Sequence, residues 1–133
     1  MDEENIRKYL ALAKEAGDRA YAPYSGFRVG AALLAEDGRV FLGCNVENVS
    51  YGATICAERV ALAKGISEGA RRFSAIFIIS GGKEFCAPCG ICRQCLMEFS
   101  LDMQVFIANG DEEYQAYGLQ QLLPSAFNAD SME

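Results

Sequence analysis

Two short cysteine stretches organise this chain: Thr54-Ile55-Cys56-Ala57-Glu58-Arg59 and Pro88-Cys89-Gly90-Ile91-Cys92. Thiolates are zinc ligands in proteins, and a catalytic zinc takes three protein ligands and keeps its fourth position for water. We therefore expect Cys56, Cys89 and Cys92 to hold one zinc ion. Glu58 stands two positions after the first ligand, so its carboxylate can reach a water on the metal without being a ligand. Together the stretches predict a catalytic zinc centre with Glu58 as its proton carrier.

The composition limits the chemistry that is available. The chain has 133 residues, a net charge of −6 and no histidine. The absence of histidine excludes Ser-His-Asp hydrolases, Cys-His proteases and zinc enzymes with histidine ligands. Proteins that bind nucleic acid present a basic face, and no stretch here is rich in Lys or Arg. A small-molecule substrate is therefore favoured over a polynucleotide.

The length and the N-terminus indicate one intracellular domain. A chain of this length forms about one domain, which we expect to span residues 1–133, with 130–133 as a loose tail. No apolar run approaches the roughly 18 residues of a membrane span, and the acidic start at residues 1–4 is unlike a signal peptide. We expect a cytoplasmic protein whose six cysteines are thiols and metal ligands instead of disulfides.

Hydrophobic periodicity predicts alternating helices and strands. The expected helices are 3–20, capped by Asp2, then 54–64, with Thr54 as N-cap and Gly65 as its end, then 88–99, and a short turn at 119–123. The expected strands are 27–35 and 39–44, which form a hairpin at Asp37-Gly38, then 72–80, 103–108 and 114–117.

These elements predict an α/β fold. The link 109–112 is too short for a parallel crossover, so the last strand should return antiparallel. The expected architecture is a three-layer α/β/α sandwich with one mixed five-stranded sheet. All three candidate ligands then lie at the starts of two helices, where free N–H groups lower thiol pKa values.

The two stretches also match a known signature. Zinc deaminases carry His (or Cys)-x-Glu followed by Pro-Cys-x-x-Cys. Cys56-Ala57-Glu58-Arg59 and Pro88-Cys89-Gly90-Ile91-Cys92-Arg93-Gln94 resemble the small cytidine deaminases, and the resemblance covers about residues 10–127. It implies the same sandwich, one zinc per subunit, and a cytoplasmic homotetramer with active sites shared between subunits that acts in pyrimidine salvage.

The resemblance implies hydrolysis of cytidine and 2′-deoxycytidine to uridine and 2′-deoxyuridine plus ammonia. Zinc lowers the pKa of a water. On this resemblance, Glu58 would pass the proton of that water to N3 while hydroxide attacks C4, and it would then protonate the leaving amine. Arg59 would offset the negative charge of three thiolates.

The same resemblance implies the substrate-binding residues. Asn45 and Glu47 look like the pair that hydrogen-bonds the ribose 3′-hydroxyl, and the N–H of Ala57 would meet the base carbonyl. Phe27 resembles the ring that packs on the base. Two further residues resemble those that reach a neighbouring subunit's site: Tyr51 and Phe127.

Three alternatives remain open. Blasticidin S deaminase, or another small-molecule aminopyrimidine deaminase, shares the fold and the metal motif. The evenly spaced Cys86, Cys89, Cys92 and Cys95 resemble an iron–sulfur protein, although the last gap is one residue shorter than in bacterial ferredoxins. The third alternative is a closed structural zinc site with Cys86 or Cys95 as fourth ligand. Such a site would give Glu58 no role. The simplest interpretation of Cys44, Cys86 and Cys95 is that they are small buried apolar residues.

Overall fold

The computed structural model describes residues 1–132, so the end of the predicted tail at Glu133 lies outside the described residues. Its sheet has the order β2-β1-β3-β4-β5. The strands are β1 (Val29–Ala35), β2 (Val40–Cys44), β3 (Phe73–Ser80), β4 (Gln104–Ala108) and β5 (Tyr114–Gly118). β3 and β4 pair in parallel, and the other neighbours pair antiparallel. The mixed five-stranded sheet, the hairpin and the antiparallel last strand are confirmed.

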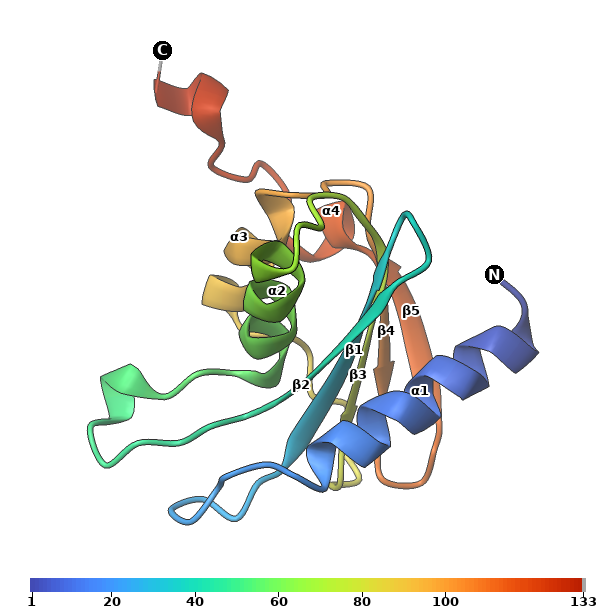
Figure 1. The fold of residues 1–133 in the computed structure, drawn as a ribbon, viewed down its shortest axis with the longest axis vertical. Helices are drawn as coiled ribbons and strands as arrows, with labels where there is room; N and C mark the ends of the chain where they lie inside the picture. Colours follow the sequence, from blue (N-terminus) through green and yellow to red (C-terminus); the bar gives the residue numbers. More distant parts are fainter. Residues whose placement is uncertain (133) are drawn as a thin grey trace.

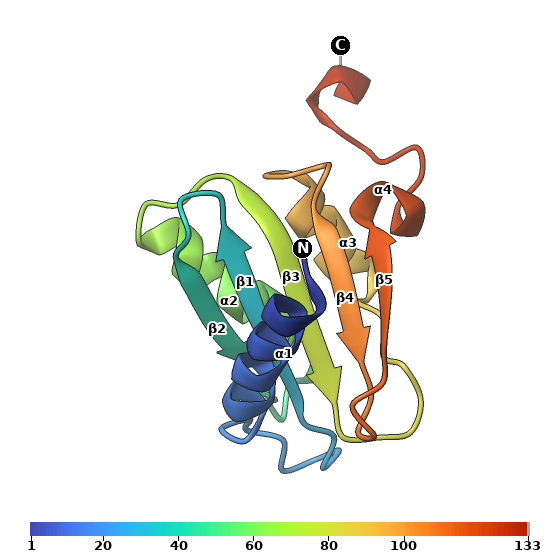
Figure 2. The ribbon, with the colours of Figure 1, turned by 90° about the vertical axis from the view of Figure 1, so that its right-hand side faces the viewer.

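Helices cover both faces of this sheet, which confirms the three-layer sandwich. α1 (Glu3–Gly17) lies on one face (Figure 1). The opposite face carries α2 (Ala57–Ser67) and α3 (Gly90–Met97), with α4 (Leu119–Leu122) beside the end of β5 (Figure 2). Two 3₁₀ turns complete the described chain, η1 (Tyr51–Ala53) and η2 (Ala129–Met132), and the latter projects away from the sandwich.

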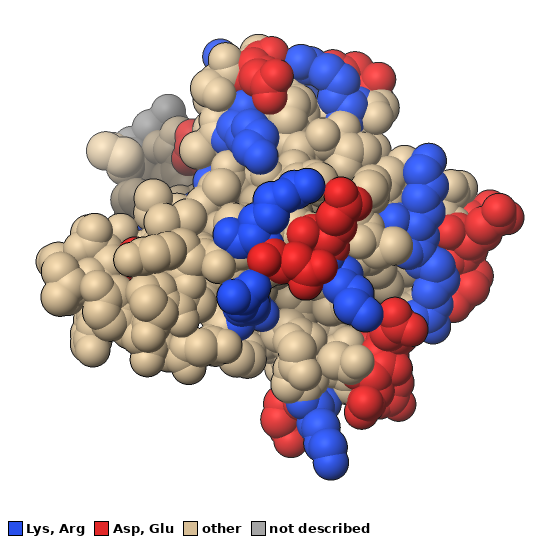
Figure 3. Space-filling view, turned by 60° about the horizontal axis from the view of Figure 1, so that its bottom comes forward, with Lys and Arg blue, Asp and Glu red and all other residues tan. Residues whose placement is uncertain are grey.

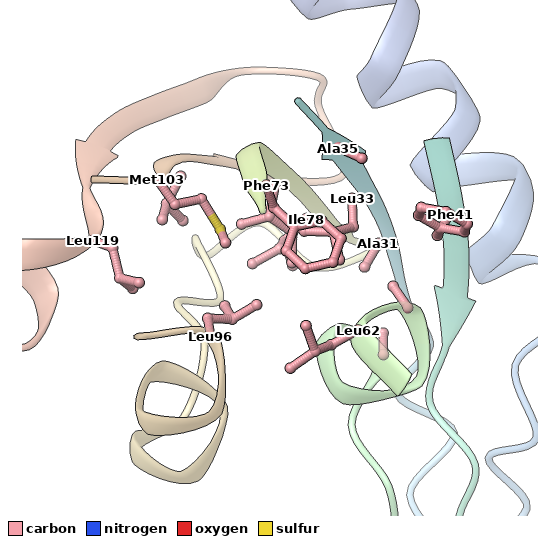
Figure 4. Packing of buried hydrophobic residues seen from close by; sticks show 14 of the residues in the cluster. Ala31, Leu33, Ala35, Phe41, Leu62, Phe73, Ile78, Leu96, Met103 and Leu119 are labelled. Atoms are coloured by element: carbon pink, nitrogen blue, oxygen red, sulfur yellow. The ribbon is translucent and has the colours of Figure 1, made fainter. Parts of the chain in front are cut away.

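The core is divided by the sheet into two layers. β1 is buried along its whole length, as a central strand covered on both faces should be. Ala31 and Leu33 point into the layer beneath α2 and α3 (Figure 4), whereas Ala32 and Leu34 point toward α1. Successive side chains of a strand alternate between faces, so the apolar run of β1 serves both layers.

Two glycines bring helices close to the sheet. A Cβ added at Gly30 would lie 1.8 Å from the carbonyl oxygen of Ala13, so α1 packs directly on β1. A Cβ added at Gly43 would lie 2.4 Å from the carbonyl oxygen of Ala57. The absence of a side chain at Gly43 therefore lets the first turn of α2 rest on β2.

The second helix begins later than its sequence suggests. Its N-cap is Cys56, so the prediction of Thr54 as N-cap is wrong. The reason is a long-range bridge, because the N–H groups of Val46 and Ile55 each donate to the other's carbonyl at 2.9 Å. This bridge holds Ile55 in an extended conformation and delays the helix to Ala57.

The other predicted helix ends also shift. α2 continues through Gly65, where an added Cβ would lie 3.0 Å from the ring of Phe41 and 3.1 Å from that of Phe73, and it ends before Gly69, whose φ is +97°. α3 begins at Gly90, two residues after Pro88, with Cys89 as its N-cap, and ends at Met97. α1 ends at Gly17 instead of residue 20, and its predicted cap is confirmed because Asp2 accepts from the N–H of Asn5 at 2.9 Å.

The surface carries charges of both signs. Figure 3 shows Lys and Arg interleaved with Asp and Glu on the face it presents, and a broad area on its left that is almost free of charge. Among residues 1–132 no helix is long and apolar enough to cross a membrane.

Candidate active site

The three predicted metal ligands lie together. The sulfur atoms of Cys56, Cys89 and Cys92 all fall within 4.8 Å of one another, and those of Cys56 and Cys89 are 3.9 Å apart. Sulfurs bound to one tetrahedral zinc at 2.3 Å lie about 3.8 Å apart. Cys56 and Cys89 are the N-caps of α2 and α3, and Cys92 is in the first turn of α3. The geometry and the donor set both fit one zinc ion that joins two helix ends.

The thiol pKa values differ from the sequence expectation. Burial raises the pKa of Cys56, although a hydrogen bond from Arg59 opposes this shift, and burial also raises the pKa of Cys92. Burial acts in the same direction on Cys89, but contacts with the N–H of Cys92 and with the neighbouring thiols outweigh it, so the pKa of Cys89 is lowered. Only one of the three shifts follows the helix-start argument, because desolvation dominates at the two more buried sulfurs. Zinc binding must therefore displace protons.

Arg59 lies against the sulfur cluster. Its Nη2 is 3.9 Å from the sulfur of Cys56 and 3.4 Å from the carbonyl oxygen of Thr54. Its hydrogen bond with Cys56 raises the guanidinium pKa, so the positive charge is secure. Three thiolates around a divalent ion leave one net negative charge, and Arg59 is placed to offset it.

Glu58 is buried in the first turn of α2, with 5% of its surface exposed. Burial raises the pKa of its carboxyl group. It lines a cavity of about 190 Å³ together with Cys56 and Cys89. A desolvated carboxyl group with a raised pKa beside three candidate ligand sulfurs is suited to accept and return a proton.

The cavity gathers part of the predicted substrate set. Phe27, Asn45 and Ala57 line the same space as Glu58. Glu47 and Tyr51 line a neighbouring depression, and Thr54 borders both. The predicted substrate-binding residues between positions 27 and 57 are therefore divided between two adjoining pockets.

Phe127 is placed apart from both pockets. It is 60% exposed, and its carbonyl oxygen accepts a hydrogen bond from Nε2 of Gln94 at 2.7 Å. The ring does not line the cavity of its own chain.

Asn45 is tightly engaged by the backbone. Its Oδ1 accepts from the N–H of Val29 at 2.9 Å, and its Nδ2 donates to the carbonyl of Phe27 at 2.8 Å. One N–H and one lone pair of the amide remain for a ligand. Asn45 therefore fixes the segment that leads from Phe27 into β1 and so helps to hold Phe27 at the cavity.

Glu47 is engaged in the same way by the preceding loop. Its carboxylate accepts from the hydroxyl of Ser25 and from the N–H groups of Tyr24 and Ser25. The hydrogen bond from the Ser25 hydroxyl has the largest effect on Glu47 and, together with the two backbone N–H groups, outweighs desolvation and holds the pKa of Glu47 below its usual value. Glu47 is thus an ionised acceptor next to the cavity.

Asn45→Ala is expected to lower the free energy of unfolding by about 2–3 kcal/mol, because a buried backbone N–H loses its acceptor. Urea unfolding of the zinc-loaded protein measures this change. Asn5→Ala, on the exposed face of α1, is the control and should stay within about 0.5 kcal/mol of the parent. Equal stabilities of the two variants would show that the bonds to Phe27 and Val29 contribute nothing.

Sequence reasoning missed several residues of the cavity wall: Val29, Thr54, Ile78, Cys86 and Ala87. The interpretation of Cys86 as a buried apolar residue is wrong, because it is only half-buried and lines the cavity. Its position three residues before the candidate ligand Cys89 was the one sequence feature that could have indicated its place near the site. Val29 and Ile78 come from β1 and β3, and Thr54 and Ala87 come from loops, so only the tertiary structure brings these side chains together.

Cys86 and Cys95 lie outside the sulfur group formed by Cys56, Cys89 and Cys92 among the described residues. This separation argues against a closed zinc site and against an iron–sulfur cluster held by the evenly spaced run. The double variant Cys86→Ala, Cys95→Ala is expected to retain one zinc per chain when assayed by metal analysis. Loss of zinc from it would instead indicate a fourth thiolate ligand.

Comparisons with known proteins agree with this site. A family model described as the cytidine and deoxycytidylate deaminase zinc-binding region matches residues 3–108. A cytidine deaminase of Halalkalibacterium halodurans is 45% identical over 133 residues, covering 99% of this chain and 98% of that protein. The crystal structure of a cytidine deaminase from Burkholderia pseudomallei superposes with a TM-score of 0.89 at 42% identity, covering 96% of this chain and all of that one. From its sequence and its fold alike, this chain belongs to the zinc-dependent cytidine and deoxycytidylate deaminase family.

Proposed function

We propose that this protein hydrolyses cytidine and 2′-deoxycytidine to uridine and 2′-deoxyuridine, with release of ammonia. The observation that carries the proposal is the shared cavity, in which buried Glu58 stands beside Cys56 and Cys89. A structural zinc site has no use for an open cavity with a desolvated carboxyl group. Similarity to cytidine deaminases over almost the whole chain supports this choice of substrate.

Cys56, Cys89 and Cys92 would hold the zinc. When bound, the metal acidifies a water so that it can attack carbon at neutral pH. The chain's own part is proton transfer through Glu58. Its carboxylate accepts a proton from the attacking water and donates it to ring N3. It then delivers the water's second proton to the departing amine, so cytidine and water become uridine and ammonia.

The cavity walls would position the nucleoside. Phe27 supplies an aromatic face for the pyrimidine, and the N–H of Ala57, free in the first turn of α2, can donate to the base carbonyl. The Asn45 amide would donate a hydrogen bond to the ribose 3′-hydroxyl, and the ionised Glu47 would accept one from it. Support for this pair is that backbone hydrogen bonds hold Asn45 in the cavity wall and Glu47 in the adjoining pocket.

The protein would act as a homotetramer with shared active sites. Exposed apolar side chains concentrate in one segment, where Val46, Val49, Tyr51 and Ile55 are 40–77% exposed. Such a patch is typical of a protein interface. This segment projects from the sandwich next to the cavity. Phe127, also exposed and away from its own cavity, would reach a neighbour's site, as would Tyr51.

We also propose a cytoplasmic location. All six cysteines are free, including three outside the sulfur group: Cys44, Cys86 and Cys95. Thiols persist in this form in reducing compartments.

The test follows loss of the cytosine absorbance band with four compounds side by side: cytidine, 2′-deoxycytidine, cytosine and blasticidin S. Both nucleosides should turn over, and cytosine about 100-fold more slowly because it lacks the ribose contacts. Turnover of blasticidin S alone would instead identify the protein as a blasticidin S deaminase. A zinc-replete protein inactive on all four would overturn the proposal.

A further inference from the structure

Two residues directly after the second cysteine stretch have no part in the proposed chemistry. Arg93 and Gln94 directly follow the ligand Cys92 in α3, and both are half-buried. Nε of Arg93 donates to the carbonyl of Pro88 at 2.7 Å, and its Nη1 donates to the carbonyl of Leu122 at 2.6 Å. One guanidinium therefore spans the loop that carries Cys89 and the end of α4.

Gln94 extends this connection along the C-terminal segment, residues 122–132. Its Nε2 donates to the carbonyl of Phe127 at 2.7 Å. Within the described residues, this bond and the bond from Arg93 to Leu122 are the only side-chain hydrogen bonds that tie the segment to the rest of the chain. Residues 124–132 are otherwise exposed, apart from half-buried Ala126.

The acceptors explain why an arginine stands here. The carbonyl of Pro88 precedes a helix, and that of Leu122 ends one, so neither has a partner inside its own helix. A guanidinium presents several donors in a rigid planar fork, whereas an ammonium is a single point charge on a flexible stem. Only the fork can hold both carbonyls in a fixed relation.

We propose that Arg93 and Gln94 are positioning residues that couple zinc occupancy to the placement of the C-terminal segment. Zinc on Cys89 and Cys92 fixes the loop at Pro88, Arg93 transmits that order to Leu122, and Gln94 transmits it to Phe127. Linkage is reciprocal, so loosening the segment must weaken zinc binding by the same factor. The inference rests on the zinc site of the proposed function.

Hydrogen exchange by mass spectrometry, with and without a chelator, tests the coupling. In the parent protein, removal of zinc should speed exchange in residues 122–128 about tenfold and leave α1 unchanged. Arg93→Gln should exchange fast there even at saturating zinc. Its zinc dissociation constant, from competition with a chromophoric chelator, should rise about 10–100-fold, as is typical when a partner of a ligand loop is lost.

Matched variants separate coupling from misfolding. Arg72→Gln, an exposed arginine outside α3 and outside the C-terminal segment, should behave like the parent in both assays. Gln94→Ala should speed exchange around Phe127 while changing zinc affinity less than Arg93→Gln does. Arg93→Lys should resemble Arg93→Gln, because the charge remains but the fork is gone. Melting temperatures and light scattering confirm that folded proteins in one assembly state are compared.

The proposal is overturned if Arg93→Gln binds zinc within about twofold of the parent, or if zinc removal leaves exchange in the segment unchanged. Full recovery in Arg93→Lys would equally refute the role of the fork. These failures differ from failure of the proposed function, in which the parent protein itself would lack zinc or turnover.

Discussion

Glu58→Gln is expected to keep one zinc per chain and to lose cytidine turnover by about 10⁴-fold, the upper range for a general acid–base residue. The amide has nearly the shape of the carboxyl group, so the cavity and the sulfur cluster stay intact. It cannot accept the proton of the attacking water or return one to the leaving amine. Measured kcat and metal content of the same preparation check both halves of this expectation.

The same substitution also separates an effect on catalysis from an effect on folding. Burial raises the pKa of Glu58, so the neutral amide is tolerated in the fold and stability should not fall. Glu36→Gln, an exposed acid outside the cavity, is the matched control and should retain the parent's kcat. A Glu58→Gln enzyme within about tenfold of the parent would remove Glu58 from the mechanism.

The sequence was most informative where local patterns coincide with the fold. The strand predicted at 27–35 is found as β1, whose residues are all buried, and the short link before β5 correctly predicted an antiparallel return. Helix ends were less predictable, because contacts distant in sequence decide them. Thr54 is a good N-cap residue, yet the bridge between Val46 and Ile55 holds the chain extended past it.

In the candidate site too, local sequence patterns predicted some features, whereas others depend on the tertiary structure. The spacing of Cys56, Cys89 and Cys92 was enough to predict that their three sulfurs lie together, since each cysteine lies at the start of a helix. Spacing could not show that the amide of Asn45 is already engaged by two backbone groups, or that Cys86 faces the cavity. Those facts depend on how β1 and the loop before α3 meet, which no local pattern encodes.

Cys89→Ala is expected to reduce zinc to well below one per chain and to abolish the stabilisation that zinc confers. A ligand at 1,000 times its dissociation constant adds about 4 kcal/mol to the free energy of unfolding. Two remaining thiols, Cys56 and Cys92, cannot complete the set of three. Thermal melts with and without added zinc, together with metal analysis, measure both effects.

The zinc-free forms distinguish loss of metal from loss of structure. Cys89 is exposed at its N-cap position and contributes little packing, so the chelated variant should melt close to the chelated parent. The half-buried Cys44 lies in β2, outside the sulfur group, so Cys44→Ala should preserve the full zinc-dependent shift. If Cys89→Ala kept one zinc and the parent's shift, the metal would be held elsewhere. The joining of α2 to α3 through sulfur would then lose its basis, because no other described sulfur lies within the group.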